Sequence, residues 1–84
     1  MKTFDYTTHG TCSRTIHIEL NDDNTVNSVS FVGGCNGNLK GIGKLVEGMP
    51  AGEVAAKLRG VTCGFKNTSC PDQLANALDE MLKG

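Results

Sequence analysis

The sequence has no excess of charge of either sign, no long apolar run and no closely spaced cysteine pair. Eight Lys and Arg oppose nine Asp and Glu among 84 residues, so the formal net charge is -1. Without a basic cluster, there is no strong signal for a protein that binds a nucleic-acid backbone. No apolar run approaches the roughly 20 residues that a membrane helix needs, so no membrane partner is predicted.

The first residues lack the apolar core of a secretory signal peptide, because polar and apolar side chains alternate over residues 1–6. We therefore expect a cytoplasmic protein, in which thiols stay reduced and a disulfide framework is not expected. The length suits one domain over residues 1–84. A domain this small often needs a metal, disulfides or a partner for stability, and a homodimer is one such arrangement.

Three segments of the first half alternate between apolar and polar residues, as strands do when one face of a sheet is buried. They cover residues 3–8, 14–20 and 26–32. Between the last two lies N-D-D-N at residues 21–24, and Asn and Asp favour turns because their side chains bond the local backbone. The second and third strands are therefore expected to form an antiparallel hairpin.

The second half has helical periodicity. The first apolar stripe consists of Leu39, Ile42, Leu45 and Val46, and Gly41 and Gly43 are expected to pack closely on the sheet. A short amphipathic segment follows over residues 53–58. The last helix begins where Ser69 and Asp72 resemble a capping box and Pro71 suits the first turn, and its predicted stripe is Leu74, Leu78, Met81 and Leu82.

The order of these elements predicts an α+β fold. A small antiparallel sheet of about three strands, from the N-terminal half, should be covered by two to three helices from the C-terminal half. No repeats, low-complexity tracts or linkers interrupt the pattern.

Four cysteines stand beside turn or helix-start residues and not inside apolar runs: Cys12, Cys35, Cys63 and Cys70. In the predicted hairpin, Cys12 precedes one strand and Cys35 follows its partner, so both are expected at the same edge of the sheet. Cys63 and Cys70 flank a six-residue segment, short enough to be a loop that leads into the last helix. If that helix packs with its N-terminus toward the same edge, the four thiols converge.

Several chemistries suit such a cluster. Four thiolates form a tetrahedral zinc site, and the same ligands hold an iron–sulfur cluster. A thiol redox pair is another reading, because Cys35 and Cys70 each precede a predicted helix, whose dipole favours the thiolate. Buried, inert thiols remain the alternative, since the sequence has no C-x-x-C. His9 is the better spare ligand, whereas His17 on the polar face of a strand is expected to be solvated.

A glycine-rich turn leads from the third strand into the first helix. Its candidate anion- or nucleotide-binding residues are Gly33, Gly34, Asn36, Gly37, Asn38 and Lys40, with Lys44 adding positive charge. The turn is not a P-loop, because Asn38 and Leu45 stand where Gly and Ser or Thr are required. The alternative is that the glycines only permit a tight turn with positive φ.

Three segments around the cysteines form a recognisable set of motifs: G-T-C-S at residues 10–13, G-G-C-N-G-N-L-K-G-I at residues 33–42, and C-G at 63–64 followed by T-S-C-P-D-Q-L at 68–74. With these motifs, the sequence resembles the TSCPD domain family over residues 4–82. Such domains occur as small standalone proteins and at the C-terminal end of adenosylcobalamin-dependent ribonucleotide reductases. The four cysteines stand at the family's cysteine positions, which have been taken to suggest a metal site.

The resemblance implies an accessory role in ribonucleotide reduction and deoxyribonucleotide synthesis. The chain is too short to hold a radical-generating cofactor and a large barrel, so a ribonucleoside-diphosphate reductase label would describe an association and not an activity. Zinc or iron is the implied cofactor, and adenosylcobalamin belongs only to the full-length reductases. The implied partners are a reductase or a nucleotide. The alternatives are a thiol redox partner of a reductase and a nucleotide-binding regulatory module.

Overall fold

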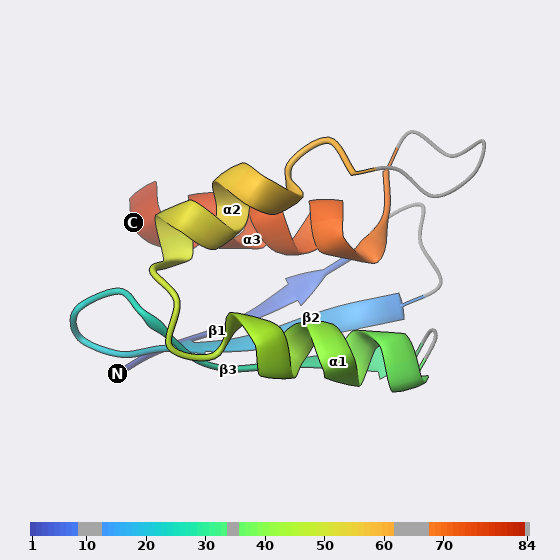
Figure 1. Ribbon diagram of the computed structural model, residues 1–84, viewed down its shortest axis with the longest axis horizontal. Coiled ribbons are helices and arrows are strands. Elements are labelled where there is room, and N and C mark those ends of the chain that lie inside the picture. Colours follow the sequence, from blue (N-terminus) through green and yellow to red (C-terminus); the bar gives the residue numbers. More distant parts are fainter. Residues whose placement is uncertain (9–12, 34–35, 62–67, 84) are drawn as a thin grey trace.

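The structure is a computed structural model that describes residues 1–8, 13–33, 36–61 and 68–83 (Figure 1). Three antiparallel strands form a sheet in the order β1-β2-β3, and helices follow. The elements are β1 (Lys2–Thr7), β2 (Ser13–Leu20), β3 (Val26–Gly33), α1 (Asn36–Val46), α2 (Ala51–Leu58) and α3 (Cys70–Lys83). The predicted α+β fold is confirmed, with the strand bounds within about one residue of the expected ones.

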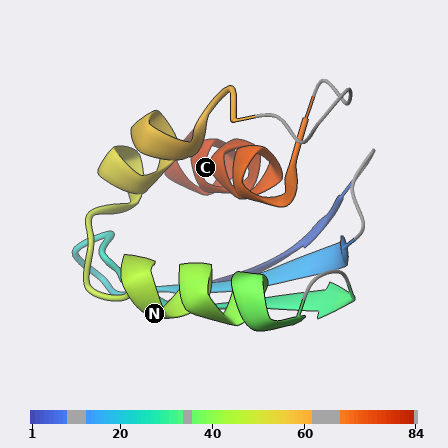
Figure 2. The ribbon, with the colours of Figure 1, turned by 45° about the vertical axis from the view of Figure 1, so that its right-hand side comes forward.

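One face of the sheet carries the core. Ile16, Ile18 and Leu20 of β2 are fully buried there, and α3 adds Leu74 and Leu78. Helices α2 and α3 lie together over this face (Figures 1 and 2). The alternation read from the sequence therefore placed the apolar side chains of the central strand on the correct face.

The opposite face of the sheet is polar. The strand register places Asp5 of β1 opposite His17 of β2, and His17 opposite Ser30 of β3. None of these three side chains is fully buried. No described helix covers this face (Figure 2), so the sheet separates an apolar layer from a solvated one.

Helix α1 packs along the edge strand β3. A Cβ atom at Gly43 would lie 2.6 Å from the Val29 carbonyl oxygen, so the close packing predicted for Gly43 is confirmed. The same prediction for Gly41 is wrong, because nothing lies within 4 Å of a Cβ there. The predicted stripe is also wrong at Leu45, which is 78% exposed. A helix that approaches an edge strand through a glycine buries a narrower stripe than one that covers a sheet face.

Helix α2 starts at Ala51, two residues before the predicted start, because Pro50 takes the N-cap position with extended backbone angles. The connection into α2 meets the β2–β3 turn through three main-chain hydrogen bonds. Val26 N–H donates to the Met49 carbonyl at 2.8 Å, Gly48 N–H to Val26 at 2.8 Å and Ala51 N–H to Asn24 at 2.9 Å. We call these residues, 21–26 and 48–51, the turn end of the molecule.

Within the described ranges, every helix is too short or too polar to cross a bilayer.

Candidate functional site at the start of helix α3

The structure describes one of the four candidate metal ligands. Cys70 is the first residue of α3, and its side chain is buried, with 6% of the residue exposed. Cys12, Cys35 and Cys63 lie outside the described residues, as does His9. Among the described residues, no group of three or more His, Cys, Asp or Glu side chains is placed to hold a metal ion. The convergence of the four thiols therefore stays a prediction.

The described residues beside the cysteines lie at one end of the molecule. Ser13, next to Cys12, and Gly33, two residues before Cys35, are direct partners in the β2–β3 register. Helix α3 starts at the same end of the sheet (Figures 1 and 2). The Ser69 hydroxyl donates to the Val61 carbonyl at 2.5 Å and so joins the two sides of residues 62–67. We call Thr8, Ser13, Gly33, Gly60, Val61 and residues 68–73 the cysteine end.

Ser69 caps α3. Its hydroxyl oxygen accepts a hydrogen bond from Asp72 N–H at 3.2 Å, which is one half of the predicted capping box. The other half is absent from the described hydrogen bonds, because the Asp72 carboxylate turns elsewhere. It accepts from Gly60 N–H at 2.8 Å and from the Thr68 hydroxyl at 2.6 Å. Asp72 thus ties the connection after α2 to the first turn of α3.

The environment of Asp72 favours its charged form. The hydrogen bond from Thr68 and then that from Gly60 lower the pKa of this carboxyl, and the positive charge of Arg59 adds to the effect. Thr68 also accepts a hydrogen bond from the amide of the buried Gln73 at 2.9 Å. Each polar residue of the T-S-C-P-D motif therefore has a structural role in starting α3, and Pro71 sits in the first turn, where a missing N–H costs nothing.

The glycine-rich turn is only partly described. Gly33 closes β3 with a φ of 82°, in the left-handed region that glycine tolerates. Gly34 lies outside the described residues, and the side chains of residues 36–38 are likewise outside what the structure describes. Asn36 begins α1 directly after this turn. The positive φ agrees with a tight strand-to-helix turn.

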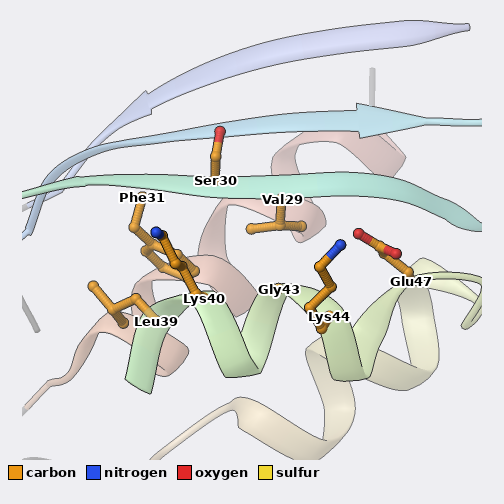
Figure 3. Close-up of a pocket in the computed structure, with 8 residues that line it drawn as sticks. All are labelled: Val29, Ser30, Phe31, Leu39, Lys40, Gly43, Lys44 and Glu47. Carbon is orange, nitrogen blue, oxygen red and sulfur yellow. The ribbon is translucent and has the colours of Figure 1, made fainter. Parts of the chain in front are cut away.

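Lys40 borders a groove of about 450 Å³ between β3 and α1 (Figure 3). Phe31 and Leu39 give the groove an apolar side near Lys40, and Lys44 lies one helical turn further along. The full lining is Val29, Ser30, Phe31, Leu39, Lys40, Gly43, Lys44 and Glu47. Two ammonium groups beside apolar side chains suit an anionic ligand that also has an apolar part.

His17 is held between two carboxylates on the polar face of the sheet. Its Nδ1 atom lies 2.5 Å from Asp5 Oδ1, and its Nε2 atom lies 3.4 Å from Glu19 Oε2. The hydrogen bonds to Asp5 and then to Glu19 raise the pKa of the imidazole above its ordinary value. His17 is partly exposed, as the sequence indicated. Glu19 lies two residues further along the same strand, whereas Asp5 is brought beside His17 by the strand register.

The sequence comparisons identify one family. A model of the TSCPD domain matches residues 1–82, essentially the whole chain, and the chain belongs to this family. No curated protein and no solved structure matches the chain.

Proposed function

We propose that this TSCPD domain is an accessory module of ribonucleotide reduction, stabilised at its cysteine end by a metal. Cys12, Cys35, Cys63 and Cys70 are the proposed ligands. The observation that supports this best is the position of their described neighbours, since Ser13 pairs with Gly33 and α3 starts at the same end of the sheet.

The donor set fits zinc or iron. Four thiolates satisfy tetrahedral zinc with no open position, as in structural sites, and iron–sulfur clusters use the same ligands. Cys70 contributes a buried position at the start of a helix, where the helix dipole favours a thiolate. A metal at this end would join the β2–β3 hairpin to the connection between α2 and α3. The metal would supply stability and no reaction step.

The size of the domain supports an accessory role. The described residues form a three-stranded sheet with helices and no barrel. Adenosylcobalamin therefore belongs to the proposal only as the cofactor of full-length reductases that carry the same domain. The proposed partner is such a reductase, and the proposed compartment is the cytoplasm, where reduced thiols stay available to a metal.

Metal content and free thiols test this proposal together. We expect about one zinc or one iron site per chain in protein purified without a histidine tag, with thiols that react only after chelation. Each single Cys→Ser variant should lose metal and stability together. Ala77→Ser is the control, because Ala77 is fully buried in α3 and its replacement should lower stability without loss of metal.

Two results would contradict the metal site. One is full metal content and stability in all four Cys→Ser variants. The other is a metal-free protein with four reactive thiols. If the metal-free protein also forms a reversible Cys63–Cys70 disulfide without losing its fold, the thiol redox function replaces the metal site. The hydrogen bond between Ser69 and Val61 supports that pair, because Ser69 directly precedes Cys70 and Val61 lies two residues before Cys63.

The groove beside Lys40 supports a second candidate function, the binding of a nucleoside phosphate. Lys40 and Lys44 would hold the phosphate, and Phe31 would lie against the base. We expect saturable binding of a nucleoside triphosphate that is lost in Lys40→Ala. Lys57→Ala is the matched control, because Lys57 is an exposed lysine of α2, 3.6 Å from Glu53, outside the groove. Equal binding by both variants would contradict this candidate.

A further inference from the structure

The two edges of the sheet differ in how they are covered. At the β3 edge, α1 approaches so closely that Gly43 abuts the Val29 carbonyl. At the other edge, β1 is bonded to β2 on one side. Among the described residues, no helix or strand lies along its outer side (Figures 1 and 2). An uncovered edge presents main-chain donors and acceptors that can pair with another strand.

The hydrogen-bond pattern shows which residues of β1 face outward. Thr8 N–H donates to the Arg14 carbonyl at 3.0 Å, so Thr8 bonds toward β2. The β1–β2 register runs from Lys2 opposite Leu20 to Thr7 opposite Thr15 without a shift. Main-chain N–H and C=O groups alternate in direction along an antiparallel strand. Those of the even-numbered residues of β1 therefore bond β2, and those of the odd-numbered residues point away from the sheet.

The β3 edge gives the same result independently. The Val29 carbonyl faces α1, so Val29 and its partner Ile18 form a pair that exchanges no hydrogen bonds. Ile18 must then bond toward β1, where its partner is Phe4. The N–H and C=O groups of Thr3, Asp5 and Thr7 consequently remain on the open side of the sheet.

Two aromatic side chains of β1 also keep part of their surface exposed. Phe4 and Tyr6 pack against the core but stay partly exposed, and their ring centroids are 6.1 Å apart. A strand added beside β1 would cover both rings. Any partner must therefore supply an extended main chain and an apolar side chain on the core face.

We propose that the outer edge of β1 pairs antiparallel with β1 of a second copy of this chain, joining two three-stranded sheets into one. In the two-fold symmetric register that we propose, Phe4 lies opposite Phe4 of the second copy. Thr3 then lies opposite Asp5 of the second copy, so a hydroxyl meets a carboxylate. The neighbouring register, centred on Asp5, is disfavoured because it places two carboxylates directly opposite each other.

This interface is small, since β1 has six residues. Strand pairing of this length buries less surface than the roughly 1,200 Å² of a standard stable interface, so the dimer should depend on concentration. If the strands pair, only the outward-pointing amides of β1 gain protection from hydrogen exchange, so protection alternates along the strand. Association through another surface would not produce this alternation.

Amide hydrogen exchange at two protein concentrations about a hundredfold apart tests the proposal. At the higher concentration, the amides of Thr3, Asp5 and Thr7 should become protected by at least about tenfold. Those of Phe4 and Tyr6, which bond β2 in the monomer, should change little. Rapid exchange of the three outward amides at both concentrations would overturn the proposal.

A pair of variants at one position provides a second test. Thr3→Pro removes an outward N–H, which an edge strand tolerates, whereas Thr3→Val leaves the N–H in place. Sedimentation should show a concentration-dependent dimer for the wild type and Thr3→Val, and a folded monomer for Thr3→Pro. A dimer that survives Thr3→Pro would overturn the proposal, because its interface must lie elsewhere. If Thr3→Pro does not fold, the amide pattern of the wild type decides.

Discussion

The two ends of the molecule are held together in different ways. At the turn end, main-chain groups bond one another: Val26 with Met49 and Gly48, and Asn24 with Ala51. At the cysteine end, the contacts between the connection after α2 and the start of α3 depend on side chains, with Ser69 bonded to Val61 and Asp72 bonded to Gly60. The hydrogen bonds that join the two segments of the turn end therefore involve no side chain. The cysteine end depends on the identity of a few residues, and in our proposal also on a metal.

The largest effect should come from a change that acts on both ends at once. Helix α1 runs from the glycine-rich turn to the turn end, and Gly43→Ala forces it away from the Val29 carbonyl. We expect a loss of about 1–3 kcal/mol in the free energy of unfolding, because the contact is with backbone that cannot rotate away. Gly41→Ala is the matched control, with open space around its Cβ.

In Gly41→Ala, the higher helix propensity of alanine should stabilise the protein by up to about 1 kcal/mol. Denaturant unfolding of both variants checks the pair. Equal effects of the two substitutions would contradict the close contact between α1 and β3.

A smaller effect, confined to the cysteine end, is expected from Asp72→Ala. The substitution leaves Gly60 N–H without its acceptor and removes the acceptor of the Thr68 hydroxyl, so we expect a loss of about 1–2 kcal/mol. The matched variant is Asp23→Ala at the turn end, where the carboxylate accepts from the main chain and hydroxyl of Thr25. That carboxylate is fully exposed, so its removal should cost less.

Calorimetry measures both Asp variants. If Asp23→Ala destabilises the protein as much as Asp72→Ala, the contrast between the two ends does not hold.

The smallest effects are those of pH. The pKa of Asp72 is lowered on folding, so its contribution is present above its ordinary pKa of 3.8 and is lost as pH falls through the lower folded value. The pKa of His17 is raised, so its contribution is present below 6.5 and is lost as pH rises through the higher folded value. His17→Gln should remove the decline of stability above pH 6.5, as measured by the unfolding midpoint against pH. If the unfolding midpoint of His17→Gln still falls above pH 6.5 as in the wild type, the Asp5–His17–Glu19 arrangement is contradicted.

Much of the fold was predictable, because its strands alternate and its last helix carries a clear start. Ile16, Ile18 and Leu20 fell on one face as expected, and Ser69 marked the first turn of α3. The sequence wrongly predicted that Leu45 is buried. The spacing of apolar residues in a helix does not show whether the helix packs on the face of a sheet or, as α1 does, along an edge strand. It also missed Gly60 as the partner of Asp72, because that contact depends on how α2 and α3 pack.

The candidate site was predictable only as a set of positions. The hairpin topology, confirmed by the pairing of Ser13 with Gly33, was the reason for expecting Cys12 and Cys35 at one edge. Spacing alone carries no information on whether Cys63 and Cys70 reach them. The contact of His17 with Asp5 was equally hidden, because only the register brings Asp5 of β1 beside it.

The most direct test of the metal at the cysteine end is amide hydrogen exchange before and after chelation. We expect faster exchange at Gly60, Asp72 and Gln73, whose N–H groups bond within the cysteine end. At the turn end, the amides of Val26 and Gly48 should keep most of their protection under the same conditions. Unchanged exchange at the cysteine end after chelation would contradict the account.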